Sequence, residues 1–316
     1  MAVGQHKQLL LLVFVISGIN LYISCSYYWE VSLSDALGIQ ASTWTPRSED
    51  SIKFYVHIEY PVVDYAARGI TTIAVGGAIT SKGVKNVNMG SFAAKFQLFT
   101  SLIPTFCKTA SRGYDYRFYL AYDITDPVFT NVRMLNTFTK TFAAETLRLC
   151  YQPRRIKCSI YMVECNYTGK PTWAQNDAML EAYLDHVDYF YRINDDSKLN
   201  TSGWVESFIS TLNQYNPPLV GVVGPNHTGG KTSILTYDFV HRTHVDIFGF
   251  YYPRLFTAWW ADGWMTDIYQ PNHSTKLTNV RLLHTKALGR RYAIPSRKPI
   301  KGASTQLEHD IEILNW

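Results

Sequence analysis

Two patterns of hydrophobic and polar positions alternate along most of this chain, and their order predicts a sheet interleaved with helices. Short apolar, β-branched runs predict strands at 71–80, 117–124, 157–165, 188–193 and 218–223. Apolar positions at helical spacing predict helices over 92–106, 126–149, 173–185 and 204–212. This alternation is typical of the α/β class, with a mostly parallel central sheet flanked by helices in a Rossmann-like manner. We expect one continuous domain over residues 69–316, and we expect Asp126 to be the N-cap of the second helix.

The first 26 residues have a different character. Leu9–Ile16 is an unbroken apolar run preceded by His6-Lys7, and the apolar character continues to Ile23. The stretch is short for a membrane span of about 20 residues, so residues 1–26 fit a signal peptide or a short signal anchor. A buried N-terminal helix of the domain is the structural alternative. Residues 27–68 show few periodic signals, and we interpret them as a stem and the edge of the domain.

Glycosylation triplets and cysteines indicate an oxidising compartment. Four N-x-S/T sequons are present, at Asn166, Asn200, Asn226 and Asn272. Four cysteines follow the apolar leader, and they could form two disulfides in any of three pairings: Cys107, Cys150, Cys158 and Cys165. We therefore expect a protein of the Golgi or ER lumen, held by its N-terminus as a single-pass type II membrane protein, or alternatively a secreted one.

Composition excludes several other classes. The chain is 47% hydrophobic and 15% aromatic, which is enough to bury a large core and is not typical of a disordered chain. The formal net charge of +5 is modest for 316 residues, and no block of five or six like charges occurs. We therefore expect no nucleic-acid partner. No C-x-x-C and no Cys/His cluster with zinc spacing occurs, so a structural zinc is not expected either.

Two adjacent carboxylates, Asp195 and Asp196, follow the strand predicted at 188–193. Ligands of open α/β sheets bind outside the carboxyl ends of the strands. Carboxylates at that position offer hard oxygen ligands to Mn²⁺ or Mg²⁺. Such a metal can hold a diphosphate and neutralise the charge that develops when a nucleoside diphosphate leaves. The alternative is that the two aspartates cap a turn.

The segment around this pair resembles the centre of GT-A-fold glycosyltransferases, in which a short acidic motif, usually written DxD, closes a strand. The matching residues are Lys170-Pro171, Asn176-Asp177 and Asp188–Asp196. Further stretches resemble a group of GT-A-like proteins of eukaryotic microbes and simple animals: Gly221–Pro225, His241–Phe248, Tyr252-Pro253 and Trp259–Trp264. The resemblance extends from about residue 70 to residue 292. It implies transfer of a hexosyl or N-acetylhexosaminyl group from a nucleotide-diphosphate sugar to a glycan, protein or lipid acceptor.

The resemblance also implies which residues hold the donor. By position, Asp195 and Asp196 would bind the metal and the diphosphate, and His284 would supply an imidazole to the metal. A solvent-facing histidine is the alternative for His284.

Three further residues are candidates for the nucleotide side of the site. Asp123, at the end of the strand predicted at 117–124, could contact the nucleotide or could be a plain turn residue. Arg290 and Arg291 could close over the phosphates through charge-assisted hydrogen bonds. They could equally form a solvated basic face.

The segment Trp259–Trp264 resembles the acceptor side of the site. Aromatic faces stack on the apolar faces of sugar rings, and Asp262 could deprotonate the acceptor hydroxyl as the catalytic base. GT-A proteins often carry two adjacent acids here, whereas the second position of this chain is Gly263. This departure favours, as an alternative, a degenerate GT-A domain that binds sugar or nucleotide without turnover. A core tryptophan cluster with an incidental aspartate is the structural alternative.

One further motif points to another class of protein. The segment Gly224–Thr232 follows the strand predicted at 218–223 and resembles a P-loop, G-x-x-x-x-G-K-[ST], as in nucleotide kinases. Counted back from Gly230, the first glycine of that motif should stand where Pro225 is, and Gly224 is one residue too early. A kinase is therefore the less favoured alternative, and we expect a loop beside the donor site.

Overall fold

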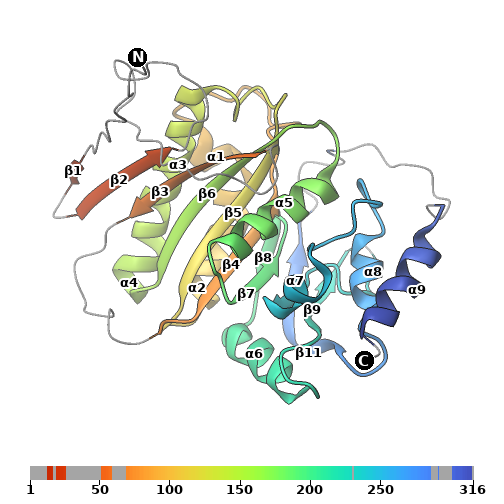
Figure 1. Cartoon of the computed structure of the whole chain (residues 1–316). Helices are drawn as coiled ribbons and strands as arrows, with labels where there is room; N and C mark the ends of the chain where they lie inside the picture. The colour runs from red at the N-terminus through yellow and green to blue at the C-terminus, as the bar shows by residue number, and fades with distance from the viewer. Residues whose placement is uncertain are drawn as a thin grey trace, which may run out of the picture.

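A single twisted sheet separates two layers of helices in this protein (Figure 1). The computed structural model describes residues 13–16, 19–25, 51–58, 69–229, 231–285, 291 and 301–314. Strands and helices alternate through most of this range, so the chain has the α/β architecture that the hydrophobic pattern predicts.

The centre of the sheet is parallel. Its four strands lie in the order β6 (Lys157–Cys165), β5 (Asp115–Asp123), β4 (Thr72–Ala78) and β7 (Tyr189–Arg192). All four were predicted from their apolar runs, which are nearly continuous because helices cover both faces of these strands. Since neighbouring parallel strands point the same way, their carboxyl ends share one edge of the sheet.

Antiparallel strands extend this centre on both sides. Beyond β6 lie β3 (Ser51–Ile58), β2 (Ile19–Cys25) and β1 (Val13–Ile16). Beyond β7 lie β10 (Phe239–His241), β9 (Val222–Thr228), β11 (Ser274–His284) and β8 (Ser197–Leu199). Besides the three central pairs, only β9 and β11 run parallel within the described sheet. The expectation of a mostly parallel sheet is therefore wrong for the whole sheet. The chain reverses direction between β9 and β10, so these two strands pair antiparallel.

One face of the sheet is covered by the helices that come from the first half of the domain together with α6. They are α1 (Phe92–Lys95), η1 (Leu98–Leu102), α2 (Ile103–Thr109), α3 (Val132–Thr146), η2 (Leu147–Tyr151), α4 (Gln152–Arg154) and α6 (Trp204–Gln214). Their phenylalanines meet in tilted and edge-to-face contacts, as Phe92 and Phe138 do at a centroid distance of 5.6 Å. The helix predicted over 92–106 is interrupted because the backbone of Phe96 is extended.

The start of α3 differs from the prediction. Asn131, not Asp126, is the N-cap, and its side chain accepts hydrogen bonds from the backbone N–H groups of Arg133 and Met134. Asp126 instead accepts from Ser81 and from the N–H of Val128. This buried carboxylate therefore ties the loop after β4 to the loop after β5, which supports the edge where both strands end.

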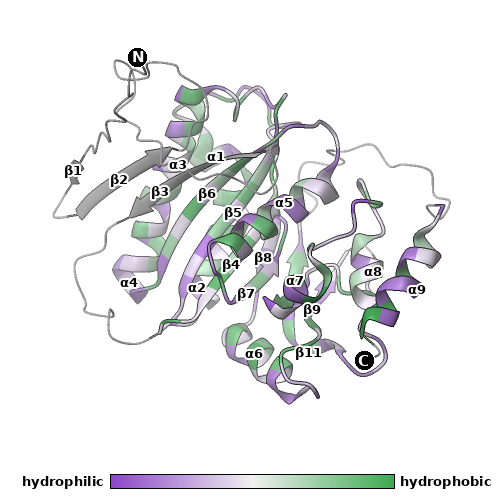
Figure 2. Ribbon diagram, viewed as in Figure 1, coloured by the Kyte–Doolittle hydropathy of each residue, from purple (hydrophilic) through white to green (hydrophobic). Residues whose placement is uncertain are grey.

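The other face is covered by α5 (Pro171–Leu184), α7 (Thr243–Phe248), α8 (Ala261–Asp267) and α9 (Ala303–Leu314). Asp310 of α9 is 1% exposed and accepts a hydrogen bond of 3.0 Å from Nε1 of Trp264 in α8. In Figure 2 the central strands are mainly green, whereas α9 shows both colours along its length. The helix thus packs one stripe on the core and turns the other to solvent.

The predicted leader and stem are described only in part. Within residues 1–26, Val13–Ile16 and Ile19–Cys25 are strands β1 and β2, and the remainder lies outside the described residues. Within 27–68, Ser51–Ile58 is strand β3, paired with β6 at the edge of the parallel centre. Among the helices of the described ranges, none combines the length and the apolar character needed to cross a membrane.

One disulfide joins Cys107 to Cys150, and the thiols of Cys158 and Cys165 are buried outside this bond. The last two stand seven residues apart on β6, and they belong to the cores on opposite faces of the sheet. They cannot pair with one another because strand side chains on opposite faces point apart. The described residues therefore contain one disulfide rather than two.

Candidate functional site

The acidic pair lies at the shared carboxyl edge of the parallel strands. After β7 the chain follows β4 for one further residue, since the N–H of Ile193 donates to the carbonyl oxygen of Gly76 at 2.9 Å. Asp195 and Asp196 follow after Asn194 and are 3% and 7% exposed. The structure thus places two nearly buried carboxylates at the edge where ligands of α/β sheets bind.

Asp196 is paired with His284. Strand β11 runs antiparallel to β8 and sets His284 opposite Ser197, the residue that follows Asp196. Nε2 of His284 lies 3.2 Å from Oδ2 of Asp196, and Thr285 donates to the Asp196 carbonyl oxygen. Burial alone would raise the pKa of Asp196, but the hydrogen bond and charge of His284, with the charge of Arg291, lower it below its ordinary value.

Asp195 is paired with Arg291. The guanidinium donates to both carboxylate oxygens, at 2.7 Å to Oδ2 and 2.5 Å to Oδ1. The same guanidinium lies 3.7 Å from Oδ2 of Asp196. This two-bond geometry is the strongest form of an arginine–carboxylate pair. Arg290, the other arginine predicted at the phosphates, lies outside the described residues.

The chemistry of these donors fits a divalent cation in part. Oδ1 of Asp196 is buried, and no described residue donates a hydrogen bond to it. A carboxylate oxygen in that position fits a cation ligand, because an unpaired buried acceptor is unfavourable. Asp195 could bind a cation only after Arg291 leaves it, since the guanidinium of Arg291 occupies both of its carboxylate oxygens. Within the described ranges, no three His, Cys, Asp or Glu side chains are grouped closely enough to hold a metal ion as they stand.

Asp123 ends β5, two strands away from β7 at the same edge. Its Oδ2 accepts a hydrogen bond of 2.8 Å from the N–H of Gly169, which follows β6. Burial raises the pKa of this half-buried carboxyl above the ordinary value for aspartate. The structure brings Asp123 to the predicted edge, and its contact with a nucleotide stays a prediction.

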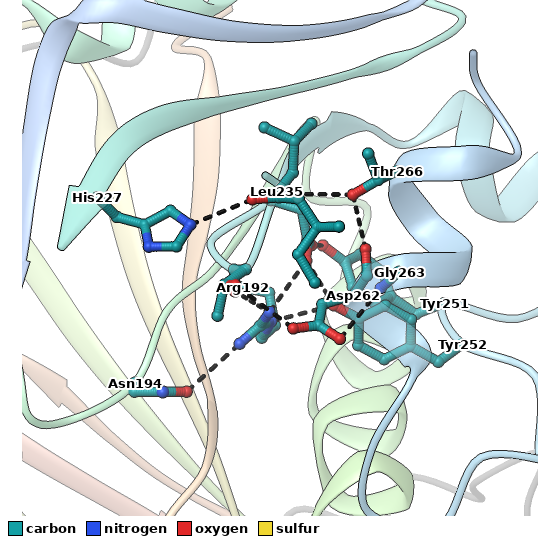
Figure 3. Close-up of polar contacts among 12 residues, drawn as sticks. Arg192, Asn194, His227, Leu235, Tyr251, Tyr252, Asp262, Gly263 and Thr266 are labelled. Carbon is teal, nitrogen blue, oxygen red and sulfur yellow. Dashed lines mark hydrogen bonds and ion pairs between the residues drawn. The ribbon is translucent and has the colours of Figure 1, made fainter. Parts of the chain in front are cut away.

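Asp262 lies in the first turn of α8. Its Oδ2 is 3.4 Å from Oγ1 of Thr236, and its Oδ1 accepts from the N–H of Gly263 at 3.0 Å. Figure 3 shows Asp262 close to Arg192, with Tyr251 and Tyr252 beside them. A Cβ atom placed on Gly263 would meet no described atom within 4 Å. The second acid of the resemblance is therefore missing from a position that has room for it.

The tryptophans of the predicted acceptor segment divide into two groups. Trp259 and Trp260 are 50% and 40% exposed, whereas Trp264 is 3% exposed and packs in the core. Trp259 and Trp260 could therefore form the predicted aromatic acceptor surface. Trp264 fits the alternative, a core tryptophan.

A buried charge network that the sequence did not reveal stands between the acidic pair and Asp262. Arg192, the last residue of β7, is 3% exposed, and its guanidinium lies 3.2 Å from Oδ2 of Asp238, which is fully buried. Nε of Arg192 donates to the hydroxyl of Tyr252 at 3.0 Å (Figure 3). The hydroxyls of Tyr251 and Tyr252 both donate to Asp238. A charged residue inside an apolar strand is the signal that could have identified this network, since buried arginine requires a partner.

Tyr237 lies between His284, which pairs with Asp196, and Arg192 of the buried charge network. Its ring centroid lies 6.4 Å from that of His284 and 5.9 Å from the guanidinium carbon of Arg192. Burial and the charge of Asp196, with a smaller contribution from Asp262, raise the pKa of this tyrosine. Tyr237 is therefore near both the acidic pair and the predicted base.

The P-loop interpretation is wrong. Residues Gly224–Thr228 belong to strand β9, and the next element is strand β10 rather than a helix. A P-loop requires a strand, a phosphate-binding loop and then the N-terminus of a helix. The residues that would begin the phosphate-binding loop therefore continue the strand, and the kinase alternative loses its structural basis.

Comparisons with known proteins do not identify a family. No family model matches the chain, and no curated protein matches it. Among solved structures, the chain is similar to the crystal structure of S. aureus TarS, with a TM-score of 0.43 and 12% identity. The match covers 68% of this chain and 36% of that chain, so this protein spans about a third of its length. A similarity of this size shows neither family nor activity, and the functional assignment rests on the geometry of the site.

Proposed function

We propose that this protein transfers a sugar from a nucleoside-diphosphate sugar to an acceptor hydroxyl, as a metal-dependent glycosyltransferase of the GT-A type. The observation that supports this function most strongly is the buried Oδ1 of Asp196 at the carboxyl edge of the parallel strands, to which no described residue donates a hydrogen bond. The mixed α/β fold is consistent with a GT-A-like arrangement. Asp195, Asp196, His284 and Arg291 meet at the edge where such a donor would bind.

The residues present define how the donor would be held. Asp196 and His284 would hold Mn²⁺ or Mg²⁺, with Asp195 joining once Arg291 has left it. The bound ion would supply positive charge to the departing diphosphate. Arg291 would then donate its two hydrogen bonds to phosphate oxygens, which match a carboxylate in geometry and charge. Arg291 would thus leave Asp195 and bind the donor phosphates instead.

The acceptor side has the groups that a deprotonation requires. Asp262 would accept the proton of the acceptor hydroxyl as the new glycosidic bond forms, if the reaction inverts configuration. Trp259 and Trp260 are exposed next to α8 and would stack on the acceptor sugar. We propose a hexosyl or N-acetylhexosaminyl group as the transferred sugar.

We propose that the reaction takes place in the lumen of the Golgi or ER. The Cys107–Cys150 disulfide supports an oxidising compartment. The acceptor asparagines of all four sequons are exposed, as N-glycosylation requires: Asn166, Asn200, Asn226 and Asn272. Membrane attachment through the N-terminal segment is part of the same proposal.

A second candidate is a GT-A domain that binds a nucleotide or sugar without turnover. Two observations favour it. Gly263 leaves Asp262 as the single acid of the acceptor segment, and Arg291 occupies both oxygens of Asp195. The two candidates share a nucleotide site and differ in whether the donor is cleaved.

Hydrolysis of the donor by the full-length chain separates these candidates. UDP- and GDP-sugars are incubated with and without Mn²⁺, and release of nucleoside diphosphate is measured. The proposal expects metal-dependent release from one donor, its loss in Asp196→Asn and its retention in Asp246→Asn, a matched change at an exposed aspartate of α7. Nucleotide binding without release would support the non-catalytic candidate. Absence of both binding and release would contradict the proposed function.

A further inference from the structure

We propose that Arg192 is a positioning residue that fixes Asp262 relative to the acidic pair Asp195/Asp196, acting through Thr236. The inference rests on the proposed function, because it assigns a role to a network next to the base of that reaction. No role was predicted from the sequence for Arg192, Thr236 or Asp238.

Arg192 reaches the acidic pair on one side. It stands at the end of β7, and its Nη1 lies 3.3 Å from Oδ1 of Asn194, the residue immediately before Asp195. Its backbone N–H donates to the carbonyl oxygen of Asp238 at 3.0 Å. The short turn that carries the two aspartates is therefore held by the same side chain that enters the network.

On the other side Arg192 holds the segment that precedes β10. Nη2 donates to the carbonyl oxygen of Thr236 and to the carboxylate of Asp238. A guanidinium has several donors in one rigid plane, so these acceptors are fixed relative to each other. Lysine, with a single flexible ammonium, could not hold the same set.

The segment held by Arg192 in turn holds the first turn of α8. Oγ1 of Thr236 is 3.4 Å from Oδ2 of Asp262. The N–H of Leu235 donates to Oγ1 of Thr266 at 2.8 Å, and that hydroxyl donates to the carbonyl oxygen of Asp262 at 2.7 Å. One contact thus reaches the side chain of the base. The other, through Thr266, reaches its backbone (Figure 3).

Charge supports the same arrangement. Arg192 is almost fully buried, and Asp238 and Asp262 both lie near enough to act on it. Asp238 also accepts hydrogen bonds from the hydroxyls of Tyr251 and Tyr252, whereas the contacts of the Asp262 carboxylate among the described residues are with Thr236 and the N–H of Gly263. Asp262 therefore depends on Arg192 and Thr236 for its position, while the charge of Arg192 is balanced chiefly by Asp238.

The experiment uses Thr236→Val in the full-length protein, because this change removes the hydroxyl and leaves the carbonyl oxygen that Arg192 holds. Thr211→Val is the matched control, since the Thr211 hydroxyl donates to the carbonyl oxygen of Ser207 within helix α6. Hydrolysis of the most active UDP- or GDP-sugar is measured with Mn²⁺, alone and in the Asp262→Asn background. We expect Thr236→Val to lower kcat roughly 10-fold with the donor KM unchanged, and to have no further effect once Asp262 is changed. Arg192→Lys should lower kcat in the same way and by more.

Three results would overturn the inference. An equal loss in both backgrounds would show that Thr236 acts independently of Asp262. A raised donor KM at constant kcat would place Thr236 in the donor site, and a loss shared by Thr211→Val would show a general effect of the substitution.

Absence of turnover in the wild type would count against the proposed function, and the network would then be judged by stability. Thermal unfolding of the wild type, Thr236→Val, Asp262→Asn and the double variant forms a complete cycle. Non-additive midpoints would support the Thr236–Asp262 link. Additive midpoints would contradict it.

Discussion

Arg291 donates to both carboxylate oxygens of Asp195, at 2.7 and 2.5 Å, and so occupies one of the two aspartates expected to bind a metal. Its neighbour Asp196 keeps a buried oxygen to which no described residue donates. The pair is therefore asymmetric, with one carboxylate neutralised by an arginine and the other available to a cation. We therefore expect a metal ion to compete with Arg291 for the carboxylate of Asp195.

Replacing Arg291 with alanine should have opposite effects on metal and nucleotide. Hydrogen bonds to charged groups are worth about 1.5–3 kcal/mol, so releasing Asp195 should tighten Mn²⁺ binding by about 10-fold or more. Binding of UDP or GDP in the presence of Mn²⁺ should weaken, because the phosphates lose the same guanidinium. Calorimetric titration of each ligand measures both effects. Arg281→Ala, an exposed arginine of β11, is the control, and unchanged Mn²⁺ affinity in Arg291→Ala would refute the competition.

Restoring the second acid of the acceptor segment should be tolerated by the fold. Gly263 lies in the first turn of α8, and a Cβ there would meet no described atom within 4 Å. Gly263→Asp should raise the free energy of unfolding by about 0.5–1 kcal/mol, since glycine is unfavourable in helices and an acid is favourable in the first turn. Urea unfolding measures this, with Gly263→Ala as the control for the glycine effect. A lower stability for both variants would contradict the open space seen here.

The same variant separates the two functional candidates. If the missing acid limits catalysis, Gly263→Asp should increase donor hydrolysis while the affinity for nucleotide stays the same. Equal hydrolysis in wild type and variant would show that Asp262 suffices as the acid of this segment.

Stability at mildly acid pH should depend on His244. This histidine is 1% exposed, its Nε2 faces the Tyr251 carbonyl oxygen at 2.9 Å and its Nδ1 faces the Tyr269 hydroxyl at 2.8 Å. Burial lowers its pKa to about 4, against which the Tyr251 carbonyl and the charge of Asp310 act. The unfolded chain therefore takes up a proton at a higher pH than the folded one, so the stabilising contribution is complete above the unfolded pKa near 6.5 and is lost as the pH falls toward 4.

The expected size of this effect follows from the two pKa values. Between about pH 7.5 and about pH 5, His244 should cost about 2 kcal/mol of unfolding free energy. His244→Gln should be less stable at neutral pH but should lose about that much less on acidification. Urea unfolding at both pH values measures the difference. Parallel pH dependence of the two proteins would show that His244 does not titrate as described.

The Cys107–Cys150 disulfide should be a major source of stability. It closes a loop of 43 residues, for which the chain-entropy estimate is about 4 kcal/mol. The Cys107→Ala/Cys150→Ala variant should unfold at a correspondingly lower urea concentration. The single variant Cys107→Ala is less informative, because the Sγ of Cys158 lies 3.7 Å from that of Cys150 and can replace the lost partner. An unchanged midpoint in the double variant would contradict a stabilising role for this bond.

Local patterns were sufficient to predict the parallel centre of the sheet and the position of the acidic pair. The apolar runs that form β4, β5 and β6 are continuous because both faces are buried, and Asp195 and Asp196 stand within four residues of the end of β7. The antiparallel half was not predicted, because pairing between β10 and β7 depends on tertiary contacts rather than on either segment alone.

Contacts of the site that depend on tertiary structure were likewise not predictable from the sequence. His284 was expected near the pair from the resemblance, and register with β8 brings it there. The partnership of Arg192 with Asp238 could not be read from the sequence, since the two residues are 46 positions apart and meet only when β10 pairs with β7. Nor could the sequence show that Arg291 takes Asp195, because both a phosphate and a carboxylate suit an arginine equally.

The most direct test of the central claim is calorimetric titration of UDP and GDP into the full-length protein with Mn²⁺, comparing wild type with Asp196→Asn. Asparagine keeps the shape of the side chain and an oxygen for His284, so the fold should be retained, and circular dichroism checks this. If Asp196 holds the metal and the diphosphate, the wild type should bind one of the nucleotides only with Mn²⁺, and the variant should bind it more than about 10-fold more weakly. Equal, metal-independent binding by the two proteins would contradict the assignment of this edge as the donor site.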